Sequence, residues 1–240
     1  MQSNIKIYED NPTVARAFAD YLKRWLSERG VVHIALSGGS TPKLLFQILA
    51  EEYRHQIRWE QMHFYWGDER CVPPTDEESN YKAAFDLLLK NVVIPEGNIH
   101  RIHGEADPIK EAKRYSKVII DNVPFTGGRP MFDLIILGMG SDGHTASIFP
   151  DQMQLLRSEQ ICEVATHPAT GQQRVTLTGR VLNNALQTVF LVTGASKAPI
   201  VKTILGQEAG HLKYPAAHIH PKHGSLDWFL DNAAANDLNK

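Results

Sequence analysis

Three short apolar segments of the sequence each run straight into a glycine-containing loop. They span residues 31–36, 62–66 and 132–137. Short apolar runs without polar alternation are typical of strands that are buried on both faces of a parallel sheet. Stretches with helical spacing separate these runs, and strands that alternate with helices predict a mostly parallel sheet with helices on both faces. The sequence therefore predicts an α/β fold.

The rest of the chain fits the same pattern. Asn11 followed by Pro12 predicts the cap and the first residue of a helix that ends near Gly30. No repeat, low-complexity tract or long linker interrupts the sequence, so we expect one domain over residues 1–240, with surface loops near 127–128 and 166–173. The further strands expected are 5–8, 174–178 and 188–193, and the further helices are 42–49, 80–89, 106–122, 196–205 and 226–235.

Composition and charge exclude several classes of protein. Hydrophobic residues make up 42% and charged residues 22% of the chain, and the formal net charge is -2. No overall field favours nucleic acid or an anionic membrane, so any anion must bind at a local site. No apolar run could span a bilayer, no secretory signal is visible, and Cys71 and Cys162 read as free thiols. We expect a cytoplasmic protein without nucleic-acid or membrane partners.

The first loop that could carry chemistry is Ser37-Gly38-Gly39-Ser40. Its two glycines let the backbone approach a ligand closely, and a helix follows with Ser40 or Thr41 as its expected cap. The free N–H groups and the dipole at a helix start favour an anion, so these four residues are candidates for phosphate binding. An ordinary glycine-rich turn is the alternative.

The second loop, Gly67-Asp68-Glu69-Arg70, follows a predicted strand. Asp68 and Arg70 would lie at the edge of the sheet where ligands bind in such folds. An arginine can hold a phosphate or carboxylate with two parallel hydrogen bonds. A surface cluster of ion pairs accounts for the loop equally well.

The third loop, residues 138–144, contains a G-x-G-x-x-G match, but Pro150 cuts short the long helix that a dinucleotide site needs. Asp142 and His144 suggest a different chemistry. An imidazole can accept a proton near neutral pH, and a carboxylate beside it can orient the ring. No G-x-S-x-G nucleophile is present, so His144 is expected to activate water directly. A structural histidine that caps a turn is the alternative.

Two further cations and a group of histidines complete the candidates. Arg174 opens a predicted strand, and Lys197 begins a predicted helix from which it could reach a phosphate. The C-terminal histidines match no zinc pattern, and we expect no metal and no cofactor. They are His211, His218, His220 and His223.

Several of these segments together resemble the 6-phosphogluconolactonase family. The Asp-Gly-His-Thr-Ala-Ser stretch that begins at Asp142 is the most specific part, and the similarity covers nearly the whole chain. The segments are 35–42, 67–70 with Ser79-Asn80, 132–150, 174–178, 194–197 and 224–231.

The resemblance implies a Rossmann-like sheet without a nucleotide, a fold shared with glucosamine-6-phosphate deaminases. It implies hydrolysis of 6-phosphogluconolactone in the oxidative pentose phosphate pathway, with His144 deprotonating water and Asp142 orienting it. The phosphate would lie against residues 37–40, with Arg174 and Lys197 as cationic partners. Arg70 would face the sugar or the developing oxyanion, and Asp68 would contact the substrate.

Two alternatives remain open. Glucosamine-6-phosphate deaminases resemble the chain in the Ser-Gly-Gly and Asp-Gly-His segments, but they typically continue into an Asn-Glu-Pro segment. Here the corresponding stretch, 147–150, has no acid, whereas the deaminase reaction needs more proton-transfer groups than lactone hydrolysis. A sugar-phosphate sensor would need a DNA-binding partner chain, because no helix-turn-helix segment is present. The sequence leaves the oligomeric state open and is compatible with a monomer.

Overall fold

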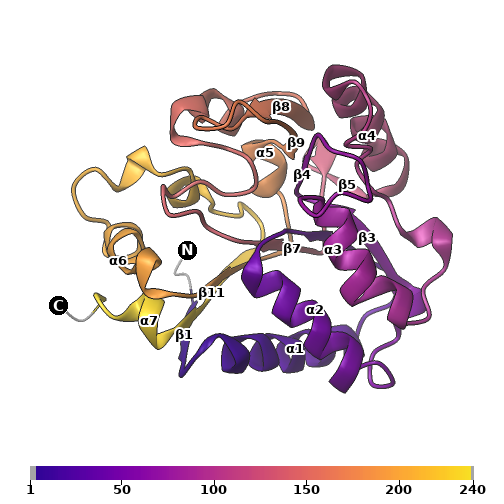
Figure 1. Cartoon of the computed structure of the whole chain (residues 1–240), viewed down its shortest axis with the longest axis horizontal. Coiled ribbons are helices and arrows are strands. Elements are labelled where there is room, and N and C mark those ends of the chain that lie inside the picture. The colour runs from indigo at the N-terminus through magenta and orange to yellow at the C-terminus, as the bar shows by residue number, and fades with distance from the viewer. Residues whose placement is uncertain (1–3, 239–240) are drawn as a thin grey trace.

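A computed structural model describes residues 4–238 and is built on a six-stranded sheet (Figure 1). The strand order is β1-β11-β10-β7-β2-β3, and every neighbouring pair is parallel. The predicted mostly parallel α/β sheet is confirmed. The strands are β1 (Asn4–Tyr8), β2 (Val32–Leu36), β3 (Met62–Trp66), β7 (Leu134–Leu137), β10 (Gln187–Val192) and β11 (Ser225–Asp231).

Helices cover both faces of this sheet. In Figure 1, α1 and α2 lie together below the sheet, whereas α4 and α5 lie above it. Within the described part of the chain, no helix is long and apolar enough to cross a membrane. The helices are α1 (Asn11–Ser27), α2 (Ser40–Glu52), α3 (Asn80–Leu87), α4 (Pro108–Asn122), α5 (Gly179–Leu182), α6 (Ala198–Leu205) and α7 (Asn232–Ala235).

Short 3-10 helices occupy several connections and account for some displaced boundaries. The helix expected at 196–205 begins as a 3-10 turn that gives way to α6, and the helix expected at 80–89 ends in another. These segments are η1 (Trp59–Gln61), η2 (Leu89–Asn91), η3 (Glu96–Asn98), η4 (Pro150–Leu156), η5 (Ala195–Lys197), η6 (His211–Lys213) and η7 (Pro215–His218).

A second, antiparallel sheet has three strands. Its order is β4-β9-β8, from β4 (Asp68–Arg70), β8 (Cys162–Thr166) and β9 (Gln173–Leu177). The expectation that residues 67–70 form a loop was therefore wrong, and β8 was not predicted. The loop predicted at 166–173 is the connection between β8 and β9, and the two glycines at 127–128 join the small hairpin of β5 (Phe125–Thr126) and β6 (Arg129–Pro130).

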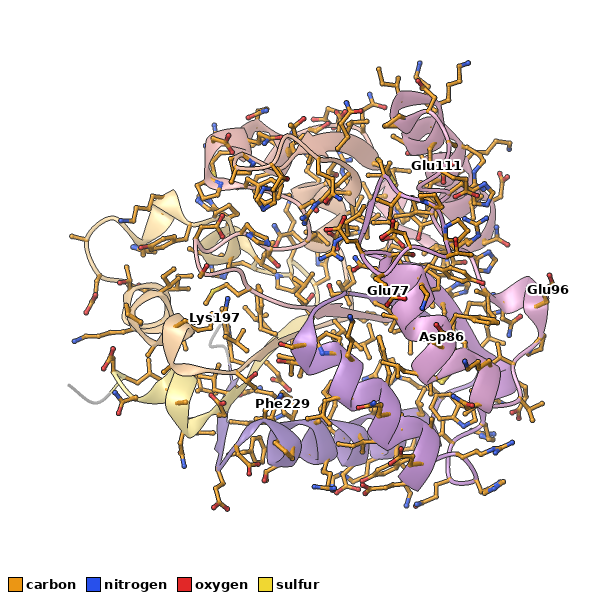
Figure 2. All side chains as sticks on the ribbon, viewed as in Figure 1. Glu77, Asp86, Glu96, Glu111, Lys197 and Phe229 are labelled. Atoms are coloured by element: carbon orange, nitrogen blue, oxygen red, sulfur yellow. The ribbon has the colours of Figure 1, made fainter. Side chains whose placement is uncertain are left out.

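The predicted helix over 226–235 was wrong, because most of it is strand β11. This strand is paired with β1 along one edge and with β10 along the other, and residues 226–231 are all buried, so side chains on both of its faces are covered. Trp228 stacks on Phe190 at 4.1 Å between ring centroids, whereas Phe229, labelled in Figure 2, meets the ring of Phe18 on α1 at 5.4 Å. A strand buried on both faces is apolar at consecutive positions, and helical spacing can be read into such a run. Only the four residues of α7 are helical.

The start of α1 also differs by one residue from the prediction. Asp10, and not Asn11, is the N-cap, and its carboxylate accepts a hydrogen bond of 2.8 Å from the N–H of Thr13. Asp and Asn are both good caps, so sequence alone does not choose between neighbours. The helix ends at Ser27, before the expected Gly30.

Candidate active site

A cavity of about 210 Å³ opens beyond the carboxyl ends of β2, β7 and β10. Parallel strands of an α/β sheet bind ligands at this edge. The cavity brings together every predicted site residue except Asp142, which contacts His144 from beside it. The predicted residues that line it are Ser37, Gly38, Gly39, Ser40, Asp68, Arg70, His144, Arg174 and Lys197.

The Ser-Gly-Gly-Ser loop presents the start of α2 to the cavity. Gly39, with a φ of 115°, is the N-cap, and no side chain caps the helix, so the predicted cap by Ser40 or Thr41 was wrong. Thr41 instead shares a hydrogen bond of 2.8 Å with Thr193. The N–H groups of the first turn therefore remain available to an anion.

Ser37 has a more limited role than the loop pattern indicated. Its hydroxyl donates to the carbonyl of Ile136 over 2.8 Å, and the residue is buried. The hydroxyl proton is thus used to tie β2 to β7 and is not offered to a ligand. Ser40, in contrast, is exposed at the mouth of the loop.

The antiparallel pairing of β4 with β9 sets two arginines side by side. Arg70 lies directly opposite Arg174, and directly opposed residues of a ladder project to the same face. Arg70 donates to the carbonyl of Glu78, but the buried Nε atoms of both arginines find no partner in the described part of the chain. Burial lowers the pKa of Arg174, and the charge of Arg70 adds to that effect, whereas Asp68 opposes it. Two adjacent guanidinium groups with unused donors are suited to binding an anion.

The two carboxylates of this segment face opposite ways. Asp68 projects with the arginines into the cavity, and its Oδ2 accepts a hydrogen bond of 2.6 Å from the hydroxyl of Ser147. Glu69 projects to the other side and accepts from the N–H groups of Asn80 and Tyr81, each at 2.7 Å. Burial raises the pKa of Glu69 despite these hydrogen bonds. Glu69 therefore holds the start of α3, and of these two carboxylates only that of Asp68 lines the cavity.

His144 is oriented by Asp142. Nδ1 of His144 lies 2.6 Å from Oδ1 of Asp142, which also accepts the backbone N–H of His144 at 3.1 Å. Burial opposes ionisation of Asp142, but these hydrogen bonds and the imidazole outweigh it and hold its pKa at about 2. An ionised carboxylate accepts only, so Nδ1 carries the hydrogen and Nε2 keeps its lone pair for a proton.

The backbone at Gly140 packs closely against the side chains of His144 and Asp142. A Cβ atom on Gly140 would lie 2.2 Å from Nδ1 of His144 and 2.5 Å from Oδ1 of Asp142. The imidazole also packs against the ring of Phe149 at 4.8 Å, and the guanidinium of Arg174 lies 5.6 Å from that ring. Phe149 thus contacts both His144 and Arg174.

Lys197 also lines the cavity. It ends η5 immediately before α6, as Figure 2 shows, and it is half-buried. Burial lowers the pKa of Lys197, and the charge of Asp142 opposes that shift. An ammonium group in such a position is available to a substrate anion.

Asn80 lines the same cavity. The Ser79-Asn80 pair is part of the family resemblance, but no role was predicted for Asn80. Its position directly after Ser79, the N-cap of α3, was the available signal. The C-terminal histidines do not gather. Within residues 4–238, no group of three His, Cys, Asp or Glu side chains is placed to hold a metal ion, and the rings of His211, His218 and His220 each pair with a backbone carbonyl.

Comparison with known proteins identifies the family of the chain. A family model described as glucosamine-6-phosphate isomerases/6-phosphogluconolactonase matches residues 11–228. The chain belongs to this family. A curated family member from Haemophilus influenzae named 6-phosphogluconolactonase is 49% identical over 208 residues, covering 86% of this chain and 88% of the relative. Another of the same name from Treponema pallidum is 41% identical and covers 82% of each chain.

Solved structures of the family superpose over almost the whole chain. The 6-phosphogluconolactonase of Trypanosoma brucei gives a TM-score of 0.88 at 28% identity, with 99% of each chain covered. A monomeric glucosamine-6-phosphate deaminase gives a TM-score of 0.82 at 17% identity, with 98% of this chain and 99% of that chain covered. The resemblance to the family and the fold shared with the deaminases are both confirmed.

Proposed function

We propose that this chain is a 6-phosphogluconolactonase that hydrolyses 6-phospho-D-glucono-1,5-lactone to 6-phosphogluconate in the oxidative pentose phosphate pathway. The observation that carries the proposal is His144, which lines a cavity rich in groups suited to anions and is paired with the Asp142 carboxylate behind it. One relative named for this activity is 49% identical over 208 residues that cover 86% of this chain.

In this mechanism His144 is the general base. Nε2 takes a proton from water while the oxygen attacks C1 of the lactone, and Asp142 stabilises the imidazolium that forms. The tetrahedral intermediate then collapses with cleavage of the bond between C1 and the ring oxygen. The imidazolium returns its proton to that oxygen, so no separate acid is needed. Arg70 stabilises the oxyanion that develops at C1.

The remaining cavity residues bind the substrate. The phosphate lies against the start of α2 at residues 37–40, with Arg174 and Lys197 as its cationic partners. Asp68 accepts hydrogen bonds from the sugar. No cofactor or metal ion takes part. The chain works as one domain over residues 1–240, in the cytoplasm, without nucleic-acid or membrane partners.

One observation separates this function from the deaminase reaction. Among the described residues that line the cavity, Asp68 is the one carboxylate, and the stretch after His144 brings no further acid. Deamination with isomerisation moves more protons than lactone hydrolysis and needs groups to carry them. A sensor would have no need for the oriented base.

The test is turnover of freshly generated 6-phosphogluconolactone by the purified chain, with spontaneous hydrolysis subtracted. Glucosamine-6-phosphate is assayed in parallel. We expect lactone hydrolysis above background and no release of ammonia. Ammonia release without lactone hydrolysis would establish the deaminase instead.

A further inference from the structure

The two glycines of the Ser37–Ser40 loop are required for different reasons. Gly39 has a φ of 115°, a conformation that disfavours any side chain, although a Cβ there would meet nothing closer than Pro42 at 3.8 Å. Gly38 is not in the left-handed region, but a Cβ on it would lie 1.8 Å from Oδ1 and 2.4 Å from Cγ of Asn80. Gly38 is therefore a glycine because the Asn80 amide occupies the place of a side chain.

The Asn80 side chain cannot move aside. Asn80 is 3% exposed, and its backbone N–H is held by Glu69 at 2.7 Å. Its amide lies 2.9 Å from the carbonyl oxygen of Asp68 and 3.4 Å from the Oδ1 carboxylate oxygen of the same residue. Both neighbours only accept hydrogen bonds, so the amide nitrogen must point toward them.

This orientation turns the amide oxygen of Asn80 toward Gly38 and the cavity. The oxygen accepts no hydrogen bond from any residue that the structure describes, and it is not among the fully buried polar atoms. It is thus a fixed, open acceptor between the phosphate-binding loop and Asp68. An acceptor held in this way favours a hydroxyl donor and rejects a ligand that lacks one.

We infer that Asn80 is a specificity residue that accepts a hydrogen bond from a ring hydroxyl of the sugar-phosphate lactone. This inference rests on the proposed function. It adds a contact that reads the hydroxylated ring, separate from the groups that hold the phosphate and from the base.

The test combines Asn80→Ala with substrates that lack single hydroxyls. Values of kcat/KM are measured for the parent lactone and its 2-, 3- and 4-deoxy analogues, with wild type and variant. With the parent lactone, we expect Asn80→Ala to lower kcat/KM by about tenfold to a hundredfold. For one deoxy analogue, kcat/KM with wild type should be lower than for the parent lactone by about the same factor. With Asn80→Ala, kcat/KM for that analogue and for the parent lactone should be equal. For the other two analogues, the fall in kcat/KM relative to the parent lactone should be the same in wild type and in Asn80→Ala.

Two outcomes would overturn the inference. One is an unchanged kcat/KM of Asn80→Ala for the parent lactone. The other is that removal of each of the three hydroxyls lowers kcat/KM by the same factor in the variant as in wild type. Inhibition by inorganic phosphate serves as the control and should be unchanged, because the hydroxyl contact leaves the phosphate site intact. If Asn80→Ala fails to fold, Asn80→Ser replaces it in the same comparison. Wild-type hydrolysis of the parent lactone, measured first, separates a failure of this inference from a failure of the proposed function.

Discussion

Replacing Asp142 by asparagine tests how the base is oriented, because the change keeps the shape of the side chain and removes its charge. Asparagine can offer its NH₂ group to Nδ1 of His144 in place of the oxygen that now lies 2.6 Å away. The imidazole would then carry its hydrogen on Nε2 and could not take a proton from water. We expect kcat to fall by about 10²–10⁴-fold. KM should change little, because Asp142 does not line the cavity.

Asp142→Asn should also lower the stability of the folded state. The pKa of Asp142 falls from its ordinary 3.8 to about 2 against the opposing effect of burial, through its hydrogen bonds with His144. A fully shielded group would thereby stabilise the fold by about 2.5 kcal/mol. The Asp142 side chain is 42% exposed, so solvent screening reduces this to about 1 kcal/mol. A lowered pKa stabilises the fold above about pH 3.8, and this stabilisation is lost as the pH falls toward about 2.

The assay pairs steady-state kinetics with urea unfolding at pH 7 and pH 3. Asp142→Asn should be about 1 kcal/mol less stable than wild type at pH 7, and the gap should narrow at pH 3. Asp151→Asn is the matched control, since Asp151 is exposed on η4 and makes no contact with His144. A variant with wild-type kcat would refute the orienting role of Asp142.

Four further predictions follow from the same geometry. Arg174→Ala and Lys197→Ala should each raise KM by about tenfold or more with a smaller effect on kcat, because phosphate contacts persist from the ground state to the transition state. A fall in kcat without a rise in KM, measured by steady-state kinetics, would contradict the phosphate role. Gly38→Ala should destabilise the fold and lower activity because of the 1.8 Å approach to Asn80, and thermal melts should show partial recovery in the double variant with Asn80→Ala. Burial, with the charges of His63 and His33, lowers the pKa of His100 to about 4. The free energy of unfolding should therefore fall as the pH is lowered from about 6.5 to about 4. Urea unfolding at several pH values should show a weaker dependence of this free energy on pH for His100→Gln than for wild type. EDTA should leave turnover unchanged, and inactivation by EDTA would point to a metal.

Sequence reasoning located the main sheet because its strands are short, apolar and followed by glycines. The strand 62–66 was predicted to the residue, and most of the others to within one or two. It failed for residues 226–235, where consecutive apolar positions satisfy helical spacing and burial between two strands as well. Pairing with β1 and β10 decides between these readings, and that information is not local.

The candidate site was predictable as a set of residues but not as a geometry. Most of the predicted residues were expected to follow a strand or begin a helix, and the carboxyl edge of the sheet gathers such positions. Arg174 is the exception, because it lies within strand β9. The side-by-side arginines depend on the register of β4 against β9, a pairing that the sequence did not reveal because both segments were too short or too polar to identify as neighbours. A role for Asn80 was not predicted for a related reason. The argument for it depends on the close approach of its amide to Gly38, which is not visible in the sequence.

The most direct measurement of the central proposal is hydrolysis of freshly generated 6-phosphogluconolactone at pH 7 by wild type and His144→Ala, with spontaneous opening subtracted. Circular dichroism and a thermal melt establish that the variant is folded. If His144 is the base, wild type hydrolyses the lactone above background and the variant loses about 10²–10⁴-fold in kcat. A folded His144→Ala enzyme that turns over the lactone at the wild-type rate would contradict the proposal.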